Sequence, residues 1–155
     1  MARDTQTIQL LDASLRGQGF QTAPDESVPD SPGIRLLLPV QDGKLVRTEL
    51  HYVTCGELFD VLQLYTTIVE DLDEHGMREL SKAANVWNFD VFLGSLAVRE
   101  DLRALFHRYS LALPSKLSAQ ECALMTESVL VTILNYIAAF QEEALALANG
   151  MTFTE

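Results

Sequence analysis

The sequence predicts an α+β fold in which helices pack on one twisted antiparallel sheet. Segments that alternate apolar and polar residues, as half-buried strands do, fall into two groups at 34–69 and 91–114. Segments with helical periodicity precede, separate and follow these groups, an order typical of helices packed on an antiparallel sheet. The predicted order is therefore α-βββ-α-ββ-α, in a single domain that spans residues 1–155.

Composition and charge limit the classes of function. The chain has 155 residues, and 48% of them are hydrophobic, an ordinary value for a domain that forms its own core. It carries 22 acidic and 11 basic residues, a formal net charge of -11. Binding to phosphate groups needs a basic surface, so we expect no direct contact with nucleic acid or with an anionic membrane. A partner that is steered by charge should be basic.

Cysteine usage and the start of the chain indicate a cytoplasmic protein. Cys55 and Cys122 are the only cysteines, too few for a disulfide framework. The first residues, MARDTQTIQLL, lack the continuous apolar stretch of a secretory signal peptide. No segment approaches the roughly 18 to 20 apolar residues of a membrane span, so no membrane contact is expected.

The N-terminal region is predicted to be a helix followed by an irregular loop. The helix covers 5–17, with Thr5 as its cap, and the apolar residues at helical spacing are Ile8, Leu11 and Leu15. The segment 21–33 contains three prolines and little apolar character, which favours a loop. A loop of this length inside a compact domain is unusual, so we expect it to be mobile or functional.

Three strands of a meander are predicted next, at 34–40, 45–55 and 61–69. The first two are joined by Gln41-Asp42-Gly43, which is a hairpin turn signal. The second strand alternates, so its residues divide between two faces of the sheet. One face carries Val46, Leu50 and Tyr52, and the other carries Arg47, Glu49 and His51.

A second helix is predicted from Asp73 to about Val86, followed by a corner and a hairpin with strands at 91–98 and 104–114. The corner contains the sequence NVWNFDVFLGSL, in which Asn85 and Asn88 suit a helix exit and a turn. Gly94 indicates a bulge or a close approach of two backbones. Trp87, at helical spacing from the apolar face of this helix, is expected to pin the helix onto the sheet.

The last helix has the clearest signals. Ser118 and Glu121 form a capping box, and Asn149-Gly150 end a helix that runs from 119 to about 148. Its apolar stripe is wider than one sheet face requires, which leaves apolar surface for a second contact. The stripe is therefore either core or a dimer interface, and its assigned residues are Val129, Ile133, Ile137 and Phe140.

No motif in the chain assigns a reaction. Phosphate loops, dinucleotide fingerprints, nucleophile elbows and zinc-protease patterns are absent from the sequence. His51 and His107 are expected to be surface or half-buried strand residues, and Cys122 falls on the apolar stripe. Cys55 lies in a turn without a flanking basic residue, so a reactive thiolate is not expected. No residue is assigned a catalytic, metal-binding or cofactor-binding role.

An acidic run before the second helix has two interpretations. The carboxylates of Glu70, Asp71, Asp73 and Glu74 lack the alternating oxygen ligands and the glycine of a calcium loop. The commoner role of such a run is a solvated turn whose charges favour the N-terminus of the following helix. The alternative is a contact surface for a basic partner.

The stretches VLQLYTTIVED, KAANVWNFDVFLGSLAVRED, LFHRYSLALP, LSAQE and NYIAAF together resemble the YbjN family of bacterial sensory transduction regulator-like proteins. That family is similar in fold to the class I type III secretion chaperones. The resemblance covers roughly residues 34–145, and it departs in the proline-rich loop at 24–32 and in Pro114-Ser115-Lys116. It implies a homodimer that binds another protein through a sheet face and the first helix, hence through Ile8, Leu11 and Leu15.

The resulting functional hypothesis is a non-enzymatic protein-binding module, chaperone-like or regulatory, without a cofactor. The resemblance places it in a bacterial stress or signalling context. The acidic charge favours a partner with a basic surface, such as a nucleic-acid-binding protein. One alternative is a dedicated chaperone for a type III secretion effector. A less favoured alternative is a small-molecule sensor with a pocket between the sheet and the last helix.

Overall fold

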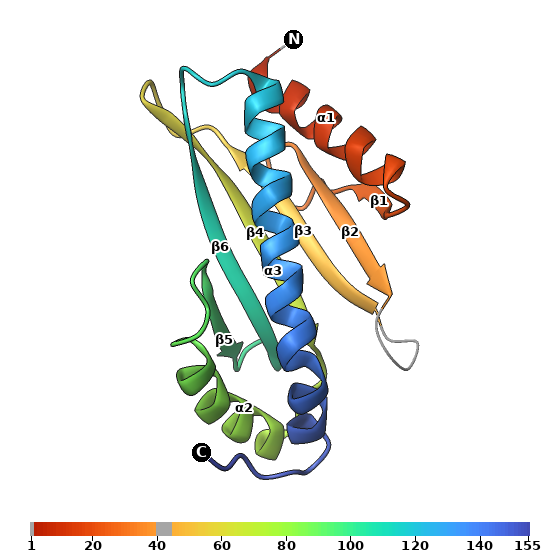
Figure 1. Ribbon diagram of the computed structural model, residues 1–155, viewed down its shortest axis with the longest axis vertical. Helices are drawn as coiled ribbons and strands as arrows, with labels where there is room; N and C mark the ends of the chain where they lie inside the picture. Colours follow the sequence, from red (N-terminus) through yellow and green to blue (C-terminus); the bar gives the residue numbers. More distant parts are fainter. Residues whose placement is uncertain (1, 40–44) are drawn as a thin grey trace. The chain divides into compact units, whose positions relative to one another are not determined.

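The computed structural model describes residues 2–39 and 45–155 and confirms the α+β class, with helices packed on one open antiparallel sheet (Figure 1). The strand order is β1-β2-β3-β4-β6-β5. In chain order the elements of the described residues are α1 (Arg3–Gly17), β1 (Gln21–Pro24), β2 (Gly33–Pro39), β3 (Leu45–Val53), β4 (Phe59–Val69), α2 (Glu74–Trp87), β5 (Ser95–Arg99), β6 (Ala104–Pro114) and α3 (Ala119–Ala148).

The chain forms two compact units. The first comprises Met1–Tyr65 with Ser110–Leu130, and the second comprises Thr66–Tyr109 with Val131–Glu155. Strands β4 and β6 and helix α3 contribute residues to both units.

In the first unit, α1 packs on β1, β2 and β3. The predicted meander is confirmed, and its hairpin turn at Gln41-Asp42-Gly43 lies outside the described residues. Strands β2 and β3 are antiparallel, with Arg35 opposite Glu49. Burial alternates along β3 as predicted, because Val46 and Leu50 are buried whereas Glu49 on the other face is partly exposed.

The predicted loop at 21–33 begins with a strand, which is a correction to the sequence prediction. β1 pairs with β2 in antiparallel register, from Gln21 opposite Leu37 to Pro24 opposite Ile34. Its exposed and polar residues hid it, and its proline is tolerated because one side of an edge strand needs no backbone partner. α1 also begins earlier than predicted, at Arg3, with Ala2 at the N-cap in place of Thr5.

In the second unit, α2 begins as predicted. The Asp73 side chain accepts a hydrogen bond from the Gly76 amide at 2.7 Å and caps the helix. Trp87 is buried at the other end, with its ring stacked on Phe140 at a centroid distance of 4.9 Å. The edge of Phe153 meets the same ring. Trp87 is thus a core residue, and the two aromatic rings that it meets lie on α3 and the C-terminal segment.

The corner between α2 and β5 is longer than predicted, because the strand begins at Ser95 and not at 91. Asn88 forms it by pairing with the backbone of Leu96, whose N–H and carbonyl bond to the asparagine side chain at 2.7 and 3.0 Å. Asn85 remains inside α2 and takes no part in these bonds. The predicted close approach at Gly94 is confirmed, since a Cβ there would lie 2.2 Å from the carbonyl oxygen of Arg108.

Helix α3 has the predicted bounds and capping box. The Glu121 N–H donates to Ser118 Oγ at 3.1 Å, and the Ser118 N–H donates to Glu121 Oε2 at 2.7 Å. Ile133 and Ile137 are buried core residues, and Phe140 stacks on Trp87. The core interpretation holds for Ile133 and Ile137, whereas Val129 and Phe140 are half-buried and leave both interpretations open.

Helix α3 is also long and apolar enough to cross a membrane by length and composition alone. This corrects the expectation that no segment approaches that limit. A single helix of this kind is weak evidence, because core helices of proteins in water pass the same test. Leu124, Met125 and Val131 of α3 are exposed, so part of its apolar surface is uncovered.

Candidate functional site

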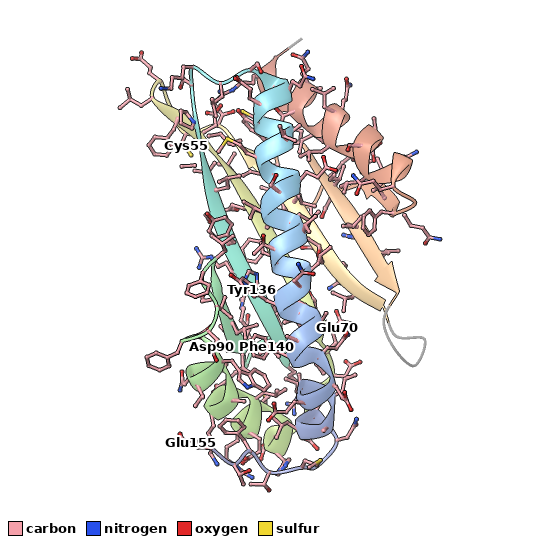
Figure 2. The ribbon with its side chains drawn as sticks, in the orientation of Figure 1. Cys55, Glu70, Asp90, Tyr136, Phe140 and Glu155 are labelled. Atoms are coloured by element: carbon pink, nitrogen blue, oxygen red, sulfur yellow. The ribbon has the colours of Figure 1, made fainter. Side chains whose placement is uncertain are left out.

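Two phenylalanines stand out on the corner between α2 and β5 in the second unit. Phe89 is 88% exposed and Phe92 is 87% exposed. Asp90, which follows Phe89 in the sequence, is labelled in Figure 2. Large aromatic side chains are costly to leave in water and rarely remain so exposed without a partner. We refer to Phe89 and Phe92 as the aromatic corner.

The backbone of the aromatic corner is held from several directions. Besides the two bonds of Asn88, the Phe92 N–H donates to the Tyr136 hydroxyl of α3 at 3.2 Å. The Leu93 carbonyl accepts from Nε2 of the buried His107 at 2.8 Å. Burial lowers the pKa of His107 more than this bond raises it, which keeps the imidazole neutral near pH 7. The corner therefore presents its two rings from a fixed backbone.

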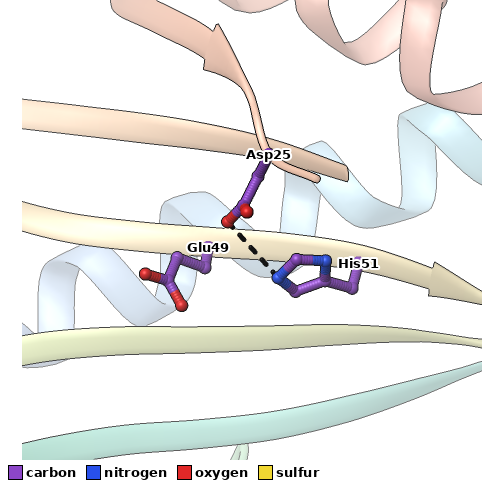
Figure 3. A group of neighbouring side chains, drawn as sticks. All are labelled: Asp25, Glu49 and His51. Atoms are coloured by element: carbon purple, nitrogen blue, oxygen red, sulfur yellow. Dashed lines mark ion pairs between the residues drawn. The ribbon is translucent and has the colours of Figure 1, made fainter. Parts of the chain in front are cut away.

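A second polar arrangement lies in the first unit, on the sheet face that points away from α1. It consists of Asp25, Arg35, Arg47, Glu49 and His51, which we call the Asp25 cluster. Figure 3 shows Asp25, Glu49 and His51. Asp25 follows the edge strand β1, and the other four come from β2 and β3. The Asp25 and His51 side chains are only 1% and 3% exposed.

Geometry within the Asp25 cluster is loose for an ion-pair network. His51 Nε2 lies 3.4 Å from Asp25 Oδ2, and Arg35 lies 3.8 Å from Asp25 Oδ1. Arg47 Nε and Glu49 Oε1 form an ion pair at 3.1 Å. Burial by itself raises the pKa of Asp25, but the hydrogen bonds from Ser27 and the electrostatic interactions with His51 and Arg35 outweigh it and lower the pKa. Asp25 is therefore a carboxylate at neutral pH.

A third group, the Arg3 network, joins α1 to the sheet and consists of Arg3, Tyr52 and Asp60. The Arg3 guanidinium donates to Asp60 at 2.8 Å and to the Tyr52 hydroxyl at 3.0 Å. It also donates to the carbonyls of Pro114 at 2.7 Å and Leu117 at 2.9 Å. The Tyr52 hydroxyl donates to Asp60. Burial raises the pKa of Tyr52 most, and this hydrogen bond raises it further. Every strong donor is used, so this group is structural.

The expected partner-binding face of the first helix is corrected by the structure. Ile8, Leu11 and Leu15 are buried against the sheet and belong to the core of the first unit. Helical spacing identified the apolar side of α1 correctly, but it could not tell whether the chain's own sheet or a partner covers that side. A partner reaches these residues only if α1 moves.

The acidic run before α2 is exposed, apart from the buried Leu72 inside it. Asp73 serves as the helix cap, so the turn interpretation is confirmed for that residue. Contact of Glu70, Asp71 and Glu74 with a basic partner stays a prediction, as does the homodimer.

Both strand histidines are buried, which corrects their expected place near the surface. Each ring lies against a glycine that leaves it room. A Cβ at Gly33 would be 2.7 Å from His51 Nδ1, and one at Gly94 would be 2.8 Å from His107 Cε1. Such cross-strand neighbours are invisible in a single sequence. The packing role of Cys122 is confirmed, since it is fully buried.

Comparisons with known proteins add no family. The chain matches none of the protein-family models searched, and no curated protein matches it. The likeness to the YbjN family therefore remains an expectation from the sequence.

The aromatic corner and the Asp25 cluster were both missed at the sequence level. The predicted strand at 91–98 would have placed Phe92 in a sheet, and the predicted loop left Asp25 without a position. One usable signal was present in the sequence. Phe89 and Phe92 lie three apart between Asn88 and Gly94, and asparagine and glycine are both residues that favour turns.

Proposed function

We propose that this protein is a non-enzymatic protein-binding module that docks its partner on the aromatic corner. The observation that carries the proposal is the exposure of Phe89 and Phe92 on a backbone fixed by side-chain hydrogen bonds. Aromatic anchors dominate the binding energy of many interfaces. Because the corner is already ordered, this chain loses little conformational entropy when a partner binds there.

The partner should offer apolar pockets beside basic side chains. The two rings require pockets, and Asp90 between them requires a lysine or an arginine. The net charge of -11 favours the same choice, since it attracts basic partners over distance and repels acidic ones. This supports the basic partner expected from composition, with a docking surface different from the one expected on α1.

A capture experiment from native lysate tests the proposal. The full chain, a Phe89→Ser/Phe92→Ser variant and a Leu58→Ser control are compared, with bound proteins quantified by mass spectrometry. Leu58 is a matched control because it is 82% exposed and lies in the other unit. We expect a partner held by the wild type and the control but lost from the double variant. All three should unfold at the same temperature, because exposed side chains contribute little to stability.

A partner retained by the double variant, or lost equally from the Leu58→Ser control, would contradict docking at the corner. The captured partner is then purified, and its affinity is measured at low and moderate salt. Affinity should fall as salt rises, and Asp90→Asn should reduce that dependence. A salt-independent affinity would remove the electrostatic part of the proposal and leave the apolar part intact.

A further inference from the structure

Three metal-ligating side chains of the Asp25 cluster converge on one point of the first unit. Asp25, Glu49 and His51 each offer one ligand atom, and these atoms lie within 4.8 Å of one another (Figure 3). Glu49 and His51 are two apart on β3, so both project from the same face of the strand. Asp25 reaches the same point from the end of β1.

We propose that Asp25, Glu49 and His51 form a binding site for a divalent transition-metal ion of the Zn²⁺ class. One imidazole and two carboxylates are donors that suit Zn²⁺ better than the all-oxygen ions Mg²⁺ and Ca²⁺. Three protein ligands would leave a further position of the ion for water. This inference is independent of the proposed docking surface, which lies in the other unit.

The separation of Asp25 Oδ2 from His51 Nε2 supports a metal site over a hydrogen bond. The two atoms are 3.4 Å apart, beyond the usual distance of about 2.7 to 3.2 Å for an N–H···O bond. Ligand atoms that lie about 2.1 Å from a tetrahedral zinc ion are about 3.4 Å from each other. Glu49 is the flexible member, and it needs to move by roughly an ångström to complete the set.

The bonding of Asp25 leaves one oxygen available. Its Oδ1 accepts from the Ser27 N–H at 3.0 Å, and its own N–H donates to the Gly33 carbonyl at 2.9 Å. Its Oδ2 is buried and accepts no hydrogen bond from any described residue. A buried carboxylate oxygen without a donor is uncommon, because desolvation then has no compensation. A cation at this point would supply it.

Two arginines neutralise the carboxylates and would compete with the ion. Arg35 is 3.8 Å from Asp25 and 3.9 Å from Glu49, and Arg47 is 3.1 Å from Glu49. Neither Arg35 contact is a hydrogen bond, and the Arg35 side chain is 43% exposed, so it can turn into solvent. Metal binding would therefore replace the charge of a loosely held guanidinium.

A hollow lies beside Asp25 at the end of β1. It has a volume of about 480 Å³ and is lined mainly by the segment 24–33, including Asp25 and Gly33, with Thr5 and Ile8 of α1. Asp25 is the one member of the Asp25 cluster that lines this hollow. The segment after β1 holds Asp25 in place through its hydrogen bonds with Gly33 and Ser27.

Calorimetric titration of the chelator-treated full chain with Zn²⁺ tests the proposal. We expect one ion per chain, and affinity at least about tenfold lower in Glu49→Gln and in His51→Asn, by analogy with the loss caused by removing supporting groups of metal sites. Arg35→Gln should bind several times more tightly than the wild type, because the competing charge is gone. Circular dichroism of each variant confirms the fold.

Controls separate this site from adventitious binding. His75 is half-buried and Cys55 is exposed, and both are candidates for a chance zinc ligand, so His75→Asn and Cys55→Ser should bind as the wild type does. The proposal is overturned if no ion binds, if Glu49→Gln binds normally, or if binding is lost in either control. Glu49 is partly exposed, so its variant decides the matter even where His51→Asn fails to fold.

Discussion

The Arg3 network and the Asp25 cluster each place a nearly buried aspartate beside an arginine, within the same unit. In the Arg3 network, the guanidinium bonds to Asp60, Tyr52 and backbone carbonyls at normal distances. In the Asp25 cluster, the Arg35 contacts are longer, and Asp25 Oδ2 and His51 Nδ1 have no hydrogen-bond partner among the described residues. Similar residue types thus form one group whose polar atoms are fully hydrogen-bonded and another in which some polar atoms have no partner.

The difference indicates different roles. A buried polar network whose donors and acceptors are all used fixes one arrangement of the chain, and here it fastens α1 to the sheet. A cluster with unused atoms carries a desolvation cost that a ligand can relieve. The tight group is therefore assigned to stability, and the loose one to binding.

Removing Asp60 should have the largest effect. Asp60→Ala leaves the Arg3 guanidinium without its charged partner in a mostly covered site, at a cost of about 3 kcal/mol in the free energy of unfolding. Urea denaturation measures it. Asp101→Ala, which breaks an exposed pair with Arg99, is the control and should leave the midpoint unchanged.

Removing Asp25 should cost less. Asp25→Ala loses the Ser27 bond and two long ion pairs, so we expect a decrease of about 1 to 2 kcal/mol in the same measurement. If Asp25→Ala lowered the free energy of unfolding as much as Asp60→Ala, the Asp25 cluster would be as tightly bonded as the Arg3 network. That result would contradict the assignment of the Asp25 cluster to binding.

Acid should weaken the Arg3 network through Asp60. Burial raises its pKa, but the bonds from Tyr52 and Arg3 outweigh burial and lower the pKa below the ordinary 3.8. The stabilisation is therefore present above about pH 4 and is lost as the pH falls through the lower value of the folded state. Unfolding curves between pH 6 and pH 2.5 should show a shallower decline for Asp60→Asn than for the wild type. Equal slopes would mean that Asp60 does not contribute.

The smallest effect is expected from Arg35. Its side chain is partly exposed and its ion pairs exceed 3.5 Å, so Arg35→Gln should change the free energy of unfolding by no more than about 0.5 kcal/mol. Thermal unfolding without added metal measures it. A clear destabilisation would make Arg35 a structural partner and weaken its proposed role as the competitor of a metal ion.

Most of the fold could be predicted from the sequence because its signals are local. The capping box at Ser118, the cap at Asp73 and the alternation along β3 each act over a few residues, and each is confirmed. β1 could not be predicted, because an edge strand of four mostly exposed residues has no apolar pattern. The late start of β5 depends on Asn88, whose side chain bonds to the backbone of Leu96. The sequence offered both Asn85 and Asn88 as turn residues, and only the structure shows which of them forms these bonds.

The sequence by itself determined the α+β class, the positions of the three helices and the strongly acidic surface, because periodicity, capping residues and charge are properties of short segments. Only the tertiary structure decided that the apolar side of α1 is core, that Phe89 and Phe92 remain in solvent, and that Asp25 meets Glu49 and His51. Such juxtapositions depend on strand register and on the space left by glycines such as Gly33, and neither is encoded locally.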